Sequence, residues 1–237
     1  MSSQAGPPYV TDDPEPVEYQ HWEVYAASAT QHTPDGVSGT LPHLEVNYGL
    51  LAEVQIHVIV PEAFVSYAGE TRRYGLGDTE VGFKYRFIDE SEDHPQVAVF
   101  PLGELPTGSE SRSLGSGHTQ VFLPVWAQKT TGKWITSGGG GYWRSPGSGN
   151  KNSWFVGLLG QYQVTKALAV GSELTYRTAQ VVRGQGSTQL NPGFVWDLSD
   201  TYHVMASAGP SLSGPRGYQS YMALQVTFGP EEKVPAK

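Results

Sequence analysis

The stretch GLGDTEVGFKYRF, residues 75–87, alternates so strictly that it decides which folds to consider. Successive side chains of a β-strand point to opposite faces, so one face of this strand is apolar and the other is charged. The apolar set is Val81, Phe83, Tyr85 and Phe87, and the charged set is Asp78, Glu80, Lys84 and Arg86. Such a strand fits a soluble barrel or sandwich with the apolar face inward, or a membrane barrel with the apolar face toward lipid.

The composition favours the membrane barrel. Charged residues make up only 16% of the 237 residues, against roughly a quarter in ordinary soluble domains. No apolar run approaches the ~18 residues of a membrane-spanning helix, which excludes a helical membrane protein. A membrane β-barrel fits, because its strands distribute their apolar residues in alternation.

Charge, cysteine content and histidine spacing exclude several function classes. A net charge of −8 without a basic stripe argues against a nucleic-acid partner. Cysteine is absent, and the seven histidines contain no closely spaced metal-ligand pair. The nearest serine–histidine pair, Ser116 and His118, lies in a loop rich in glycine and serine. We therefore expect no enzymatic activity, no catalytic residues, no metal and no cofactor.

The alternation recurs along the chain and predicts twelve strands. An even number is typical of bacterial single-chain barrels. The expected fold is therefore all-β, a single antiparallel up-and-down transmembrane barrel of about 12 strands. The predicted strands are residues 21–30, 42–50, 52–60, 75–87, 95–105, 118–128, 133–144, 154–165, 167–178, 189–198, 202–212 and 218–228.

The connections between these strands alternate between short and long, which is the arrangement of outer-membrane barrels with short periplasmic turns and longer outer loops. The longer connections are residues 31–39, 67–75, 105–118, 145–153 and 181–188. Both ends of the barrel domain then lie on the periplasmic side. We expect an extended periplasmic lead-in at residues 1–19, the barrel at 20–229 and a charged tail at 230–237.

Aromatic residues concentrate near the predicted strand ends, where membrane barrels place girdles of rings at the two lipid headgroup levels. The alternative explanation is that aromatic residues simply favour strands. The predicted girdle residues are Tyr48, Tyr67, Phe87, Trp134, Tyr142, Trp143, Trp154, Tyr176, Tyr202 and Tyr218.

The beginning of the chain allows two interpretations of its location and two of its structure. Residues 1–10 have no basic start or apolar stretch, so the chain is either cytosolic or a mature chain without a signal peptide. The strand pattern favours the second, in the bacterial outer membrane. Residues 11–18, TDDPEPVE, either fold into the periplasmic mouth, where their acids meet Lys84, Arg86 or Arg177, or form a solvated tail. Prolines and acidic residues favour the tail.

Four motifs carry a resemblance to a known family. The most specific is GLGDTEVGFKYRF, a Gly-Leu-Gly-Asp turn leading into a strand with inward basic residues. The others are GPPYVTDDPEPVEYQHWEVY (6–25), PLGELPTG (101–108) and SWFVGLLGQYQ (153–163). Together they resemble the meta-pathway phenol-degradation family of outer-membrane β-barrel transporters. The resemblance implies an outer-membrane barrel of monomer size with a transport role and no established catalytic residues.

If the apolar face contacts lipid, the charged face lines the lumen. Lys84 and Arg86 would then reach Glu53 or His57 on the neighbouring strand, since cross-strand neighbours lie roughly 5 Å apart. These groups either tie the barrel interior together or form a polar constriction that selects solutes. The pore-lining candidates are Glu45, Glu53, His57, Glu80, Lys84, Arg86, Glu173, Arg177 and Asp197, and Glu23 shares their face.

We therefore expect an outer-membrane channel or passive transporter for small, hydrophobic or aromatic, solutes. The expected partners are outer-membrane lipid or detergent and a small-molecule solute, with the chain acting as a monomer. Two alternatives stay open. One is a soluble β-barrel that binds a ligand inside an apolar interior, and the other is a structural barrel with a blocked lumen.

Overall fold

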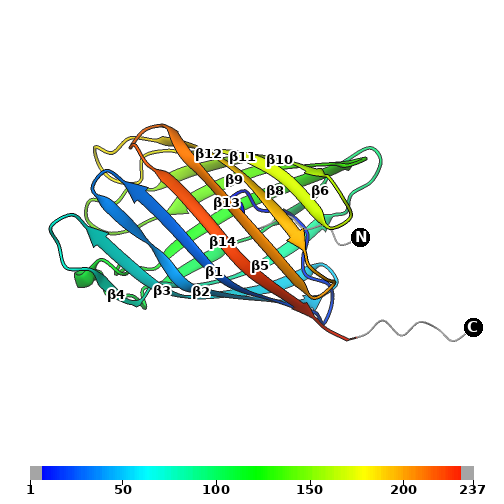
Figure 1. Cartoon of the computed structure of the whole chain (residues 1–237), viewed down its shortest axis with the longest axis horizontal. Helices are drawn as coiled ribbons and strands as arrows, with labels where there is room; N and C mark the ends of the chain where they lie inside the picture. The colour runs from blue at the N-terminus through cyan, green and yellow to red at the C-terminus, as the bar shows by residue number, and fades with distance from the viewer. Residues whose placement is uncertain (1–6, 231–237) are drawn as a thin grey trace, which may run out of the picture.

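The computed structural model describes residues 7–230, whose strands form one closed antiparallel β-barrel (Figure 1). The strand segments are β1 (Trp22–Thr33), β2 (Gly36–Leu51), β3 (Val54–Tyr67), β4 (Arg73–Leu76), β5 (Thr79–Ile88), β6 (Gln96–Val99), β7 (Leu102–Leu105), β8 (Gln120–Thr131), β9 (Trp134–Arg144), β10 (Ser153–Gln163), β11 (Leu168–Arg177), β12 (Ser187–Asp197), β13 (Tyr202–Ser213) and β14 (Tyr218–Phe228). A single 3-10 turn, η1 (Glu110–Arg112), lies in the loop before β8. Within the described residues, no helix is long and apolar enough to cross a membrane.

These segments make twelve barrel strands, because two of the strands are interrupted. β4 and β5 pair successively along β3, and β7 and β6 pair successively along β8. Phe100 and Pro101 separate β6 from β7, and a proline has no N–H to donate to the ladder. The barrel closes where β1 pairs with β14, with Trp22 opposite Phe228. The predicted twelve-stranded up-and-down barrel is confirmed.

The outer surface of the barrel is apolar and the inner surface is largely polar. On β5, the Phe83 side chain is 48% exposed, whereas the adjacent Lys84 is only 4% exposed. On β10, Leu158 is 63% exposed and Gln161 is 2% exposed. So continuous an apolar exterior is stable against lipid and not against water. The soluble-barrel alternative, which requires the reverse arrangement, is therefore excluded.

Short turns close one end of the barrel and longer connections lie mostly at the other, as predicted. We call these the periplasmic end and the outer end, following the orientation of bacterial barrels. The loop predicted at residues 31–39 is wrong, because β1 continues to Thr33 and β2 begins at Gly36. Polar serine, threonine and glutamine side chains can pair in a strand that extends above the lipid, where hydropathic alternation no longer marks it.

Aromatic rings lie at both ends of the outer surface. At the periplasmic end the ring centroids of Trp134 and Tyr162 are 5.0 Å apart, and at the outer end those of Tyr142 and Trp154 are also 5.0 Å apart. Trp143 was predicted as a girdle residue, and this prediction is wrong. Its position along β9 turns it into the lumen, where it is 8% exposed.

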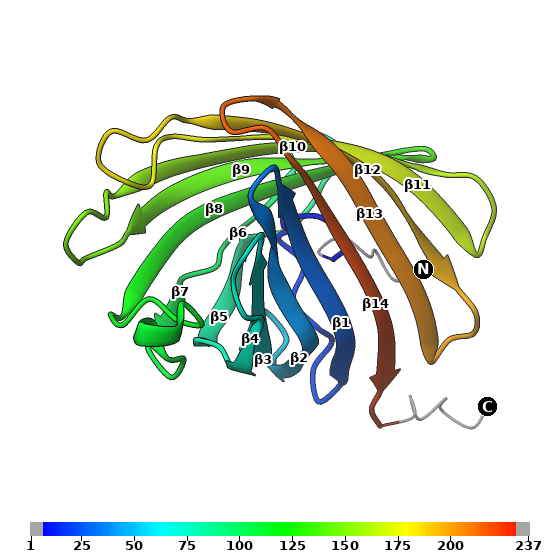
Figure 2. The ribbon, with the colours of Figure 1, turned by 60° about the vertical axis from the view of Figure 1, so that its left-hand side comes forward.

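The described residues extend beyond the barrel at both ends of the chain. Residues 7–18 precede β1 and lie inside the barrel, as Figures 1 and 2 show for the dark-blue coil within the ring of strands. Almost all of the predicted tail at residues 230–237 lies outside the described residues. The division of the chain at residues 19 and 230 stays a prediction.

Candidate functional site

Residues 7–18, called here the lumenal segment, occupy the periplasmic half of the barrel interior. Thr11 is 0% exposed and Asp13 is 2% exposed. Of the two alternatives for TDDPEPVE, the structure therefore has the folded one. Four of the segment's residues are prolines, which have no backbone N–H and so lower the number of donors that burial must satisfy. The buried members are Pro8, Tyr9, Thr11, Asp13, Pro14, Pro16 and Val17.

Ion pairs tie this segment to β5. The Lys84 ammonium lies 3.1 Å from an Asp12 carboxylate oxygen and 3.3 Å from one of Asp13, and it also donates to the carbonyl of Glu15. The Arg86 guanidinium lies 3.9 Å from the Glu15 carboxylate. Burial raises the pKa of the Asp13 carboxyl, and the positive charge of Lys84 opposes that rise. A buried cation and its acids compensate one another here, which holds the segment in place.

Glu173 on β11 holds the backbone of the same segment. Its carboxylate accepts the N–H groups of Val10, at 3.0 Å, and Thr11, at 2.8 Å, and the side-chain amide of Asn191, at 2.7 Å. Burial, and then the charge of Glu173, raises the pKa of the Tyr9 hydroxyl. A carboxylate that receives several N–H groups makes charge-assisted bonds, which are stronger than neutral ones.

Glycines on the inner face leave the space that the segment fills. A Cβ atom added at Gly157 would lie 2.2 Å from Oγ1 of Thr11, and its three nearest atoms all belong to Thr11. At Gly171 the added atom would lie 2.9 Å from the Tyr9 hydroxyl and also close to Gln161 and Gly160 of the neighbouring strand. The segment is therefore the closest neighbour at Gly157 and one of several at Gly171. The barrel wall is therefore shaped to contain it.

A polar chain continues from the segment across β2, β3 and β5. The His57 ring lies 2.6 Å from the Asn47 side-chain oxygen through Nδ1 and 3.0 Å from Glu80 through Nε2. Asn47 donates to Glu45 at 2.8 Å. Arg86 donates to Glu53 at 2.7 Å, as the cross-strand prediction expected. Lys84 instead contacts the lumenal segment, because the segment's acids lie nearer than Glu53 or His57.

Five buried aromatic residues, called here the aromatic wall, face the lumen beside this polar chain, and the Phe100 ring lies 5.2 Å from that of His57. Phe122 stacks on Trp143 with ring centroids 4.7 Å apart and meets Phe155 edge-on at 6.1 Å. The Arg177 guanidinium lies 5.5 Å from the ring centroid of Trp143 and 5.3 Å from that of Phe155. Gly139 leaves room for one of these rings, since an added Cβ atom would lie 2.8 Å from the Trp126 ring. The aromatic wall consists of Phe100, Phe122, Trp126, Trp143 and Phe155.

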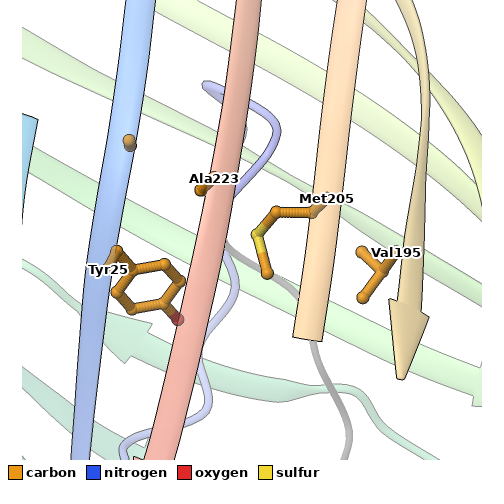
Figure 3. Close-up of a cluster of buried hydrophobic side chains, with 5 residues drawn as sticks. Tyr25, Val195, Met205 and Ala223 are labelled. Atoms are coloured by element: carbon orange, nitrogen blue, oxygen red, sulfur yellow. The ribbon is translucent and has the colours of Figure 1, made fainter. Parts of the chain in front are cut away.

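A smaller apolar patch lies on β1, β12, β13 and β14. Figure 3 shows Tyr25, Ala223, Met205 and Val195 on these four strands. The Tyr25 hydroxyl donates to Glu23 at 2.7 Å and accepts from the Gln225 amide at 2.9 Å. This patch packs beside the lumenal segment, since Tyr25 and Met205 share a small cavity of about 170 Å³ with residues of the segment.

Two further cavities lie toward the outer end and are called here the outer vestibule. Their volumes are about 310 Å³ and about 180 Å³, and both are lined by Val10, Gln31 and Gln219. The smaller one also reaches Phe155 and Arg177. The vestibule therefore contacts the lumenal segment at Val10 and reaches the aromatic wall at Phe155.

The sequence-predicted site residues divide into three groups. Glu53 and Asp197 lie at the periplasmic rim, where Asp197 contacts His203 at 2.8 Å. Arg177 lines the outer vestibule. It forms no ion pair with the acids of the lumenal segment, which were predicted to contact Lys84, Arg86 or Arg177. The remaining six surround the lumenal segment or the polar chain beside it: Glu45, His57, Glu80, Lys84, Arg86 and Glu173. Their role in lining a conducting pore stays a prediction.

Sequence reasoning missed the aromatic wall. On β8, Phe122, Pro124 and Trp126 share one parity while Val121, Leu123 and Val125 share the other. Both faces are apolar, so alternation does not show which one points inward. The glycines opposite these rings are the signal that was available, since a small residue across a strand pair marks a close approach.

Comparison with known proteins supports the outer-membrane barrel fold. The model of the family described as "Putative MetA-pathway of phenol degradation" matches residues 29–228, as the resemblance in the sequence predicted. A search of curated proteins found no match.

Solved structures with the same fold include outer-membrane porins. The KdgM porin superposes with a TM-score of 0.62 at 12% identity, over 87% of this chain and 99% of that one. The NanC porin gives 0.60 at 9% identity, over 86% and 98%. The translocator domain of the autotransporter NalP from Neisseria meningitidis gives 0.52 at 8% identity, over 88% and 87%. At these identities the likeness shows the fold, which is that of an outer-membrane barrel.

Proposed function

The chain belongs to the family described as "Putative MetA-pathway of phenol degradation", and on that premise we propose an outer-membrane channel that lets small aromatic solutes cross passively. The observation that carries the proposal is the aromatic wall, whose buried rings face the lumen beside the outer vestibule. Rings that stack offset or edge-on attract one another beyond the apolar area that they bury. An aromatic solute can therefore replace water along this wall.

The path begins at the outer vestibule and leads along the aromatic wall to the lumenal segment. Charges beyond that point bias which solutes continue, because a narrow polar lumen selects by charge and hydrogen bonding. The segment narrows the periplasmic half, so passage requires it to shift. Its ties are ion pairs and hydrogen bonds to Lys84, Arg86 and Glu173, which water can replace once the segment moves.

The same segment favours a second candidate, a structural barrel with a blocked lumen. Thr11 is fully buried, and the space left by Gly157 fits it closely. A permanent block predicts no solute flux at all. The two candidates therefore differ in a quantity that can be measured.

The test is swelling of liposomes that contain the full chain, with phenylalanine or leucine as solute. Both are zwitterions of similar size that cross a bare bilayer slowly, so only the ring distinguishes them. We expect phenylalanine to enter about two- to tenfold faster, the equivalent of one aromatic contact of about 0.5–1.5 kcal/mol. The Trp143→Leu variant should lose this preference. Trp154→Leu is the matched control, because Trp154 is on the outer surface.

Equal entry of the two amino acids, unchanged in Trp143→Leu, would argue against an aromatic pathway. Absence of swelling in the wild type and also in Lys84→Ala, which loosens the segment, would establish the blocked barrel instead. Both variants need a heat-modifiable gel shift to show that the barrel has folded.

A further inference from the structure

Arg177 differs from the other cations on the inner face of the barrel. Lys84 and Arg86 each lie within 4 Å of carboxylates. Among residues 7–230, no carboxylate forms an ion pair with Arg177, whose guanidinium instead lies beside the rings of Trp143 and Phe155. The negative charge of Glu104 acts on the Arg177 guanidinium without forming an ion pair. The Glu104 carboxylate accepts a hydrogen bond from the Gln120 side chain instead.

The cavity beside Arg177 is lined by hydrogen-bonding groups and not by carboxylates. The cavity of about 180 Å³ beside it is lined by Thr175, Gln180, Gln189 and Gln219, and no aspartate or glutamate among the described residues lines it. The Gln189 side-chain oxygen is buried without a hydrogen-bond partner. A cation in such a cavity attracts anions, because its field is not cancelled locally.

The ring of Phe155 adds an apolar surface to the same cavity. A planar guanidinium presents several N–H donors in a fork that matches a carboxylate, and it also stacks on aromatic faces. Arg177 and Phe155 both line the cavity, with the guanidinium 5.3 Å from the ring centroid. A guanidinium beside an aromatic ring matches a ligand in which a carboxylate is attached to an aromatic ring.

We propose that this cavity, called here the Arg177 site, binds small aromatic carboxylates. The carboxylate accepts hydrogen bonds from the Arg177 guanidinium, and the ring lies along Phe155. The adjoining cavity of about 310 Å³, the other part of the outer vestibule, shares Val10, Gln31 and Gln219 with it and gives the ligand an approach. The inference rests on the proposed function, since it names the solute class that such a channel would hold before passage.

The test is binding to the detergent-solubilised full chain by isothermal titration calorimetry. Benzoate is the probe, benzamide is its neutral counterpart, and cyclohexanecarboxylate keeps the charge without the aromatic ring. We expect benzoate to bind most tightly of the three. Arg177→Gln should weaken benzoate binding about ten- to a hundredfold, the equivalent of a hydrogen bond to a charged group. Arg144→Gln is the matched control, because Arg144 is exposed at the end of β9.

Arg177→Lys provides a second variant that keeps the charge in case the glutamine variant does not fold. It should bind benzoate with intermediate affinity, because an ammonium lacks the planar fork. The Arg177 site is refuted if benzamide binds as tightly as benzoate, or if Arg177→Gln and Arg144→Gln weaken binding equally. Benzoate binding through Arg177 without any phenylalanine preference in liposomes would instead refute the proposed channel and leave the site standing.

Discussion

Two cationic regions of the lumen differ in what neutralises them. Around Lys84 and Arg86, acids from the lumenal segment and from the barrel lie within 4 Å of the cations. Around Arg177, two aromatic rings lie within 6 Å, and no ion pair forms within residues 7–230. The cations of the first region are neutralised by carboxylates of the protein, whereas the cation of the second region can pair with a solute.

The difference separates groups that hold the fold from groups that can bind. Breaking a buried ion pair leaves an uncompensated charge, so residues of the first region are expected to act on the position of the segment. A cation that only contacts ring faces keeps most of its N–H donors available.

Lys84→Ala should have the largest effect, because it leaves Asp12 and Asp13 in the lumen without their cation. Breaking such a pair costs about 3–5 kcal/mol, which here favours release of the segment to water. Barrel insertion should be unaffected, and single-channel conductance in planar bilayers should rise. The chain has no cysteine, so a Thr11→Cys background also reports release through its labelling by a thiol reagent.

The control for Lys84→Ala removes the acids together with the cation. Adding Asp12→Asn and Asp13→Asn should return the labelling of Cys at position 11 toward the slow rate of the parent. Equal release with and without the two asparagines would mean that charge does not hold the segment.

Phe83→Arg should have the next largest effect. It places a charge on the lipid-facing surface of the barrel that encloses both cationic regions. Phe83 is 48% exposed on β5, next to Lys84. A cation at the bilayer midplane costs about 2–4 kcal/mol, so the yield of barrel inserted into liposomes should fall. Phe83→Leu should insert normally, and normal insertion of Phe83→Arg would reverse the assignment of the two faces.

Glu173→Gln should loosen the segment less than Lys84→Ala does. The Glu173 carboxylate accepts the N–H groups of Val10 and Thr11, and a charged hydrogen bond contributes about 1.5–3 kcal/mol. Thiol labelling at position 11 should accelerate. Glu104→Gln is the matched control, since Glu104 bonds to Gln120, and comparable release in that variant would contradict the specific role of Glu173.

Gly157→Ala should have the smallest effect of the four. The added methyl group would meet Thr11 first, at 2.2 Å from its Oγ1, and overpacking costs about 1–3 kcal/mol. Labelling at position 11 should increase modestly. Gly160→Ala on the same strand has no neighbour within 4 Å and should behave as the parent. Indistinguishable labelling in the two variants would show that Gly157 does not shape the wall for the segment.

The alternation of β5 shows why the faces of the barrel could be predicted. Each residue's parity sets its face, and the two faces of GLGDTEVGFKYRF differ fully in polarity. The nine lumen candidates follow from that rule, and Arg86 with Glu53 follows from cross-strand distance. The rule loses its power on β8, where both parities are apolar, and at the outer rim, where both are polar.

The position of residues 7–18 could not be predicted in the same way. Prolines and acids are typical of a solvated tail, and they also suit an irregular segment that has few N–H groups and a buried Lys84 to contact. The two states differ in long-range contacts, such as Thr11 against Gly157 and Val10 against Glu173. Nothing in the local sequence distinguishes them.

The strand number, the lipid-facing side and the charged lumen can be predicted from the sequence, because side-chain parity in a strand is a local property of the backbone. Which cations have acidic partners depends on the tertiary structure. Lys84 and Arg177 both carry a positive charge, but the closed barrel brings the acids of a distant segment to one and aromatic rings from β9 and β10 to the other. Partner choice depends on which strands the barrel places side by side and on what fills its interior, and that is settled by packing over the whole chain.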